Sequence, residues 1–116
     1  MSFEDLDVWK RSARLSATLY QQLGTLSNWG FRDQITRSGL SVPSNIAEGF
    51  ERDSDAEIAR FLTIAKGSCG ELITQTYIGI EAGFIAKDLG MSWVKEAKEI
   101  NAILGALIKR HRSRNP

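Results

Sequence analysis

The sequence has few of the residues that build metal centres and disulfide scaffolds. Among its 116 residues there is one cysteine, Cys69, and one histidine, His111. A single cysteine excludes an intrachain disulfide, and this pair cannot supply the several converging ligands of a His/Cys metal site. Walker, dinucleotide-binding and nucleophile-elbow spacings are absent as well. We therefore expect no metal, no cofactor and no catalytic residue, and we interpret Cys69 as a small core residue.

Long apolar runs and a one-sided charge are also missing. No run of 18 apolar residues occurs, and the acidic start Ser2-Phe3-Glu4-Asp5 lacks the apolar stretch of a signal peptide, so we expect a cytoplasmic protein without a membrane partner. Fifteen basic residues against fourteen acidic ones leave a net charge of +1, too small for a strong global field. The length predicts a single domain, 1–116, with a basic tail at about 109–116.

The apolar residues that are present recur at the three- and four-residue steps of amphipathic helices. This spacing predicts helices at about 5–23, 29–52, 55–82 and 87–110. Short connections then predict an all-α, antiparallel up-down four-helix bundle. In the first helix the expected core stripe consists of Leu6, Trp9, Ala13, Ser16, Tyr20 and Leu23, and it is widened by Val8, Leu15, Leu19 and Leu26 beside it. The expected stripe of the second helix consists of Phe31, Ile35, Ser38, Val42, Ile46 and Gly49. Those of the third and fourth helices consist of Ile58, Phe61, Leu62, Ala65, Cys69, Leu72, Thr76 and Ile80, and of Trp93, Ala97, Ile100, Leu104 and Leu107.

Several capping, glycine and proline residues indicate where these helices begin, end or bend. Ser54 and Glu57 have the spacing of a capping box, and Gly24 and Gly83 are expected to end helices. Pro43 falls inside the second helix, whose stripe keeps its phase across the proline, so one kinked helix is predicted. Gly39, four residues earlier, would give the proline ring room.

Other glycines within the predicted helices need a reason, because each interior glycine costs about 0.5–1 kcal/mol relative to alanine. We interpret them as points of close contact between helices. The patch Gly67-Ser68-Cys69-Gly70 leaves two interpretations open, tight packing inside the bundle or a surface on which another subunit docks.

A polar stripe runs along the second helix. Arg37 is spaced to reach Ser41 or Asn45 on the following turns, and serine and asparagine are mediocre helix formers. The stripe is either a solvated face or a polar network at an interface. Its members are Gln34, Arg37, Ser41, Asn45, Glu48 and Arg52.

The run Ser41-Val42-Pro43-Ser44-Asn45-Ile46-Ala47-Glu48-Gly49 resembles the signature of the bacterial 23S rRNA intervening-sequence proteins. Similar pieces surround it in order, from Leu6-Asp7-Val8-Trp9-Lys10 to Gly83-Phe84-Ile85. The resemblance implies an antiparallel four-helix bundle that forms homo-oligomers, pentamers in known relatives. The residues that carry the motif, and an interface if it lies there, are Gln34, Arg37, Ser41, Pro43, Asn45, Glu48, Gly49, Gly67, Ser68 and Glu71.

The resemblance also extends to a related group, the accessory variability determinants of diversity-generating retroelements. That accessory is a basic pentamer that binds a reverse transcriptase and nucleic acid. The net charge of +1 and the proline-asparagine motif both favour the intervening-sequence branch over this group.

Two function classes remain open. The first is a non-enzymatic, homo-oligomeric accessory that binds RNA or another nucleic acid through clustered cations. The alternative is a protein-interaction scaffold, for example a partner of a reverse transcriptase, with no nucleic-acid contact of its own. An enzyme is the weakest class, because nothing arranges Glu48 and Glu71 as an acid–base pair. The candidate nucleic-acid contacts are Lys10, Arg11, Arg14, Arg32, Arg37, Lys109, Arg110, Arg112 and Arg114.

The charge pattern also has an acidic part. Residues 48–57 hold five acidic residues against Arg52, so the small net charge is a cancellation between basic and acidic segments. The basic segments could equally be ordinary solvated faces. Oligomerisation is expected on physical grounds as well, because the apolar stripe of the first helix is wider than one bundle seam needs.

Overall fold

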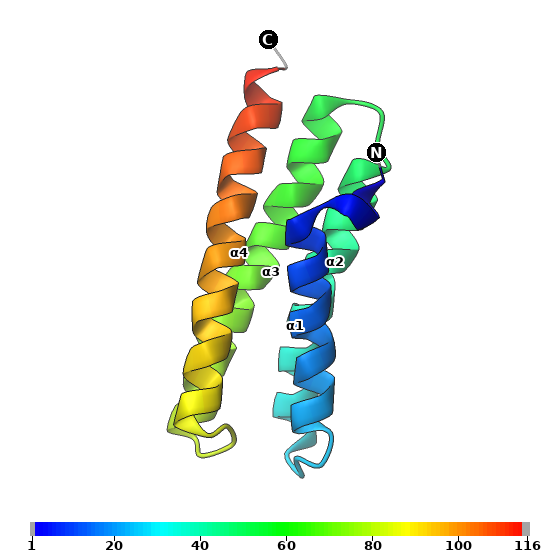
Figure 1. The fold of residues 1–116 in the computed structure, drawn as a ribbon. Coiled ribbons are helices and arrows are strands. Elements are labelled where there is room, and N and C mark those ends of the chain that lie inside the picture. Colours follow the sequence, from blue (N-terminus) through cyan, green and yellow to red (C-terminus); the bar gives the residue numbers. More distant parts are fainter. Residues whose placement is uncertain (1, 115–116) are drawn as a thin grey trace.

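The computed structural model describes residues 2–114, and all regular structure in this range is helical. A short 3-10 helix, η1 (Phe3–Asp5), precedes four long helices, which are α1 (Asp7–Leu23), α2 (Trp29–Phe50), α3 (Asp55–Glu81) and α4 (Lys87–Ser113). Successive helices run in opposite directions, so that the start of α1, the α2–α3 connection and the end of α4 share one end of the molecule (Figure 1). The predicted all-α four-helix bundle is confirmed. Within the described residues, no helix is both long and apolar enough to cross a membrane.

The helix ends follow local side-chain chemistry. The Asn28 side chain accepts a hydrogen bond from the backbone of Phe31, and the Ser54 hydroxyl accepts one from Glu57 (3.2 Å), which satisfies orphan donors of the first turns. The reciprocal hydrogen bond of the predicted capping box, from the Ser54 backbone to the Glu57 side chain, is not formed among residues 2–114. Gly83 follows the end of α3 with a φ of 79°, the left-handed conformation that glycine adopts without strain.

The apolar stripes predicted for α2, α3 and α4 do form the core. Each buried leucine or isoleucine there contributes about 1.5–3 kcal/mol by leaving water. Helix α4 continues past the predicted end to Ser113, so residues 109–113 of the predicted tail are helical, while residues 115–116 lie outside the described range. The largest fully buried side chains include Leu19, Ile35, Val42, Ile46, Leu62, Cys69, Leu72, Ile100 and Leu104.

In α1, Ser16 and Leu23 of the predicted stripe are buried, but the centre of the buried face is shifted toward the flanking residues Val8, Leu15 and Leu19. This face consists of Val8, Ser12, Leu15, Ser16, Leu19 and Leu23, whereas Tyr20 of the predicted stripe is 48% exposed. Trp9 and Ala13 of that stripe turn instead toward α2, where they line a groove with Leu40 and Pro43. Both sides of α1 are apolar, so spacing alone did not identify the side that meets the core.

Gly39, Gly49 and Gly79 mark close helix contacts, as predicted, and Gly90, for which no such contact was predicted, marks another. A β-carbon on Gly39 would collide with Leu19 of α1, and one on Gly49 would lie 3.0 Å from the β-carbon of Phe61. Gly79 and Gly90 lie equally close to neighbouring side chains. The prediction was wrong for Gly67 and Gly70, where an added β-carbon would meet nothing within 4 Å.

Pro43 lies inside α2, as expected, and is buried. A kink at this residue stays a prediction. Room for the proline ring at Gly39 likewise stays a prediction, while a β-carbon on Gly39 would meet the Leu19 side chain of α1. Gly39 therefore allows α1 and α2 to approach each other closely.

Candidate functional site

The family-like motif forms a polar bridge between α2 and α3. The Ser41 and Ser68 hydroxyls share a 2.7 Å hydrogen bond, and the Asn45 amide donates to both the carbonyl and the hydroxyl oxygen of Ser41, each at 2.9 Å. Because Ser41 Oγ accepts from Asn45, its own proton is available for Ser68. The network is satisfied within one chain, and each such bond contributes about 0.5–1.5 kcal/mol.

Most other motif residues also have structural roles or face solvent. Pro43 lines the α1–α2 groove, and Gly49 lets Phe61 of α3 pack closely. Glu48 forms an ion pair with Arg52 along the surface of α2. The predicted reach of Arg37 to Ser41 or Asn45 is not seen among the described hydrogen bonds. The exposed members of the motif are Gln34, Arg37, Glu48, Gly67 and Glu71.

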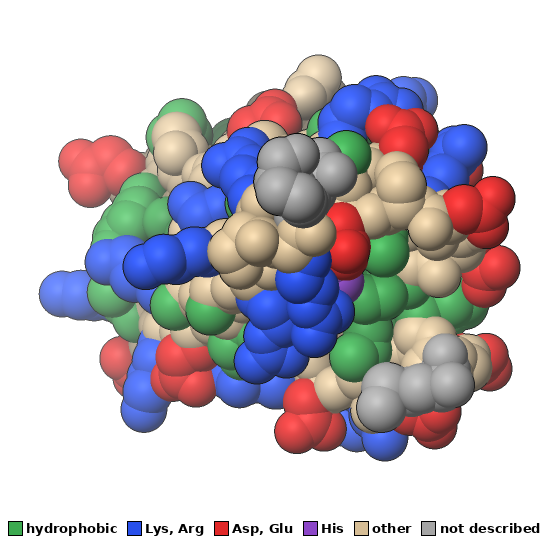
Figure 2. All heavy atoms as spheres, turned by 90° about the horizontal axis from the view of Figure 1, so that it is seen from above, with side chains coloured by type: hydrophobic (Ala, Val, Ile, Leu, Met, Phe, Trp, Pro, Cys, Tyr) green, Lys and Arg blue, Asp and Glu red, His purple; other side chains and the backbone are tan. Residues whose placement is uncertain are grey.

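The basic residues at the end of α4 are exposed together. None of Lys109, Arg110, Arg112 and Arg114 forms an ion pair within residues 2–114, and the Arg112 guanidinium donates a 3.4 Å hydrogen bond to Thr63 of α3. Figure 2, which views the molecule from this end, shows Lys and Arg side chains gathered around its centre. Cations here are also favoured by the partial negative charge at a helix C-terminus.

His111 differs from these neighbours. It is only 6% exposed, its Nδ1 lies 2.6 Å from the Asp55 carboxylate, and its ring meets Phe50 edge to face. The sequence had placed this histidine in a solvated basic tail. Instead it joins the end of α4 to the first turn of α3 and the end of α2, which holds the surrounding cations in place.

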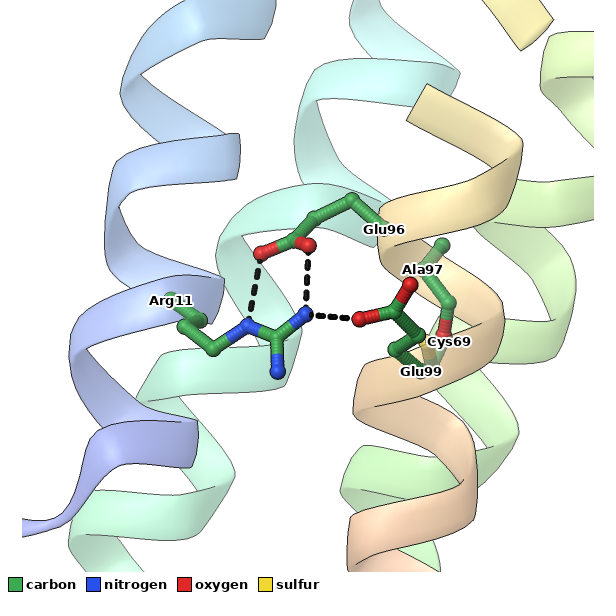
Figure 3. Close-up of polar contacts among 5 residues, drawn as sticks. All are labelled: Arg11, Cys69, Glu96, Ala97 and Glu99. Carbon is green, nitrogen blue, oxygen red and sulfur yellow. Dashed lines mark hydrogen bonds and ion pairs between the residues drawn. The ribbon is translucent and has the colours of Figure 1, made fainter. Parts of the chain in front are cut away.

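Arg11, one of the predicted nucleic-acid contacts, is occupied within the bundle. Its guanidinium donates from Nε and Nη2 to Glu96 at 2.9 and 2.6 Å, and from Nη2 to Glu99 at 2.7 Å. Figure 3 shows the Arg11 side chain reaching from α1 between these two carboxylates of α4. The hydrogen bond that Arg11 donates lowers the pKa of Glu96, and the hydrogen bonds that Arg11 donates to Glu96 and Glu99 raise the pKa of Arg11. The Arg11 guanidinium is therefore bonded to carboxylates of its own chain and is not available to a phosphate group.

The remaining predicted cations are dispersed. Arg32 stacks over the Trp29 ring at 4.3 Å and donates to the Gly24 carbonyl, so it caps the end of α1. This position is at the opposite end of the bundle from the end of α4 (Figure 1). Lys10 and Arg14 on α1 and Arg37 on α2 are exposed. The nine predicted cations do not form one surface.

Two adjoining hollows between α3 and α4 bring the predicted Arg112 near three basic residues that sequence reasoning missed, Arg60, Lys66 and Lys98. Each has a volume of about 550 Å³, and they share Thr63. Lys66 and Lys98 line the first, and Arg60 and Arg112 line the second. Residues 66 and 98 belong to different helices, so no local spacing signals that they meet. The first hollow is completed by Gly67, Gly70, Ile73 and Asn101.

Cys69 is a core residue, as predicted. It is 1% exposed, its thiol donates to the Ala97 carbonyl at 3.1 Å, and burial raises the pKa of the thiol to about 11. A thiol with this pKa is a poor nucleophile at neutral pH. Among the residues that the structure describes, no group of three or more His, Cys, Asp or Glu side chains could hold a metal ion.

Four amphipathic helices around one core, with a polar bridge joining α2 to α3, define an all-α bundle protein of the four-helix class. The family model described as 23S rRNA-intervening sequence protein matches residues 4–106. The chain therefore belongs to the 23S rRNA-intervening sequence protein family, and the resemblance of the Ser41–Gly49 run is confirmed.

The fold is also similar to a crystal structure from Bacteroides thetaiotaomicron. That protein is described as one of unknown function from the S23 ribosomal protein family. It is 26% identical in sequence with a TM-score of 0.82, and the match covers 88% of this chain and 98% of that one. No curated protein matches this chain. Neither the family description nor that of the Bacteroides protein names a catalytic activity.

Proposed function

We propose that this protein is a non-enzymatic, homo-oligomeric accessory that binds the phosphate backbone of RNA. The observation that carries the proposal is the group of exposed cations at the end of α4, Lys109, Arg110, Arg112 and Arg114, which form no ion pair with any of residues 2–114. The buried contact between His111 and Asp55 fixes the helix turn that presents them. Neutralising phosphates with such cations releases counterions, and an oligomer multiplies the number of contacts.

The RNA-binding part is tested by the salt dependence of binding to an RNA hairpin. We expect the double variant Arg110→Gln/Arg114→Gln to bind more weakly than the wild type. Its slope of log affinity against log salt should be smaller by about 0.7–0.9 for each lost phosphate contact. Absence of wild-type binding even at low ionic strength would refute RNA binding. An intact oligomer without RNA affinity would instead favour a scaffold that binds another protein.

The oligomeric part is supported by apolar surface that the single chain leaves uncovered. The groove between α1 and α2 has a volume of about 340 Å³ and is lined by Phe3, Trp9, Leu40 and Pro43 among others. A second exposed apolar position lies on α3 outside the two hollows, where Ile78 is 54% exposed. A cyclic head-to-tail assembly, such as the pentamer expected from the resemblance, requires two different surfaces of this kind.

Light scattering tests this assembly. Leu40 is 48% exposed at the α1–α2 groove, and Met91 is 40% exposed on α4, away from that groove. We expect Leu40→Glu to reduce the molar mass in solution, because the introduced carboxylate would be buried at the contact, while Met91→Glu should leave it unchanged. A wild-type protein that is monomeric at micromolar concentration would contradict the proposal.

A further inference from the structure

The two hollows between α3 and α4 adjoin at Thr63 and are together referred to here as the α3–α4 groove. One hollow extends from Ala56 to Ile64 on α3, and the other from Thr63 to Ile73. With a helical rise of 1.5 Å per residue, the groove is roughly 25 Å long. A groove of this length is long enough for several nucleotides of one extended strand.

The charge of the α3–α4 groove has one sign. Its lining includes Lys66, Lys98, Arg60 and Arg112 and no aspartate or glutamate. Arg60 is offset by an ion pair with Glu57. The other three cations form no ion pair among residues 2–114, so they remain available to an anionic ligand.

The floor of the groove is open to a ligand. Gly67 and Gly70 contribute to its lining, and a β-carbon on either would meet nothing within 4 Å. Packing within the chain therefore does not require glycine at these positions, although each glycine costs helix stability. Because they have no side chains, the two glycines leave the hollow between Lys66 and Lys98 unfilled.

An exposed aromatic ring lies beside Lys98, one of these cations. Tyr77 is 42% exposed, and the Lys98 ammonium lies 6.0 Å from the centre of its ring. Cations that follow a backbone, combined with an exposed aromatic ring on which a base stacks, are the two elements of single-strand nucleic-acid binding.

We propose that the α3–α4 groove binds a single-stranded segment of RNA. Lys66, Lys98 and Arg112 contact phosphates at separate points along the strand, and a base stacks on Tyr77. This inference rests on the proposed RNA-binding function and goes beyond it, because it assigns the strand to a surface formed by residues 56–112. It also names unpaired RNA, rather than a duplex, as the ligand of that surface.

The test uses a fluorescein-labelled ten-nucleotide oligouridylate, with anisotropy measured over a range of salt concentrations. We expect Lys66→Gln and Lys98→Gln each to lower the slope of log affinity against log salt by about 0.7, the value for one phosphate contact on a single strand. The charge-matched control is Lys87→Gln, at the start of α4 and outside the groove, which should change the slope little. Circular dichroism and thermal unfolding establish that each variant remains folded.

Stacking is tested separately with Tyr77→Leu, which keeps an apolar side chain and removes the ring. We expect this variant to bind oligouridylate at least about fivefold more weakly than the wild type. Stacking of one base on an aromatic ring raises the affinity by about this factor or more. Tyr20→Leu is the matched control, since Tyr20 is similarly exposed but lies on α1.

The outcomes separate the two proposals. If the wild-type protein binds neither oligouridylate nor an RNA hairpin at low salt, the RNA-binding function itself fails. If the wild type binds RNA, but Lys66→Gln and Lys98→Gln match Lys87→Gln, only the assignment to the α3–α4 groove is overturned. The same holds if a ten-base-pair RNA duplex binds at least as tightly as the single strand.

Discussion

Two glycines on the same helix should respond to alanine with opposite signs. Gly67 and Gly79 both lie within α3, where alanine is favoured over glycine by about 0.5–1 kcal/mol in a helix interior. At Gly67 the added methyl group meets nothing within 4 Å. We therefore expect Gly67→Ala to raise the free energy of unfolding by nearly the full difference.

At Gly79 the same methyl group has no space. It would lie 2.6 Å from Cζ of Phe31 and 3.0 Å from Cγ1 of Ile85, which belong to α2 and to the α3–α4 turn. Overpacking of this kind costs about 1–3 kcal/mol, which exceeds the gain in helix propensity. The expected net result for Gly79→Ala is a loss of about 1 kcal/mol, or roughly 3–5 °C in Tm for a chain of this size.

Urea and thermal unfolding at one fixed protein concentration would measure both changes, because oligomerisation makes Tm depend on concentration. Equal stability changes of the same sign in Gly67→Ala and Gly79→Ala would refute this reasoning. A concentration-dependent loss of stability confined to Gly67→Ala would place that face of α3 in a contact between subunits.

Two further predictions follow from the perturbed groups. The pKa of Glu96 is lowered by the hydrogen bond from Arg11, so the ion pair stabilises the fold above the unfolded-state pKa, and this contribution is lost as the pH falls through the folded-state pKa. Because both side chains are about a third exposed, we expect the ion pair to contribute about 0.5–1 kcal/mol to the free energy of unfolding. In urea titrations below about pH 5, the free energy of unfolding of Glu96→Gln should therefore fall less steeply with decreasing pH than that of the wild type. The thiol of Cys69, with a pKa raised to about 11 by burial, should react with Ellman's reagent at pH 8 only as fast as the protein unfolds. Rapid labelling of the folded protein would show that α3 and α4 open locally around this residue.

Local sequence patterns determined much of the fold. The three- and four-residue spacing of Ile35, Ser38 and Val42 identified the buried face of α2 because a regular helix brings such residues to one side. Ser54 and Gly83 marked helix ends through interactions with their own neighbouring backbone. The Ser41–Gly49 run was specific enough to identify the family before any contact was known.

The tertiary structure decided what depends on pairs of residues from different helices. Both sides of α1 are apolar, so only packing showed that Leu15 and Leu19, rather than Tyr20, face the core. His111 is surrounded by basic residues in sequence, yet Asp55, 56 residues away, makes it a buried structural contact.

The availability of each charged side chain also depended on residues from other helices. Fifteen basic and fourteen acidic residues could be counted from the sequence, but whether a cation is available depends on which carboxylate lies next to it. Arg11 is held by Glu96 and Glu99 from α4, whereas Lys66 and Lys98 meet across a groove without any acidic lining residue. Helix periodicity is a property of consecutive residues and can be read along the chain. The pairing or clustering of charges is set by distances of a few ångströms between helices, and only the packed bundle determines those distances.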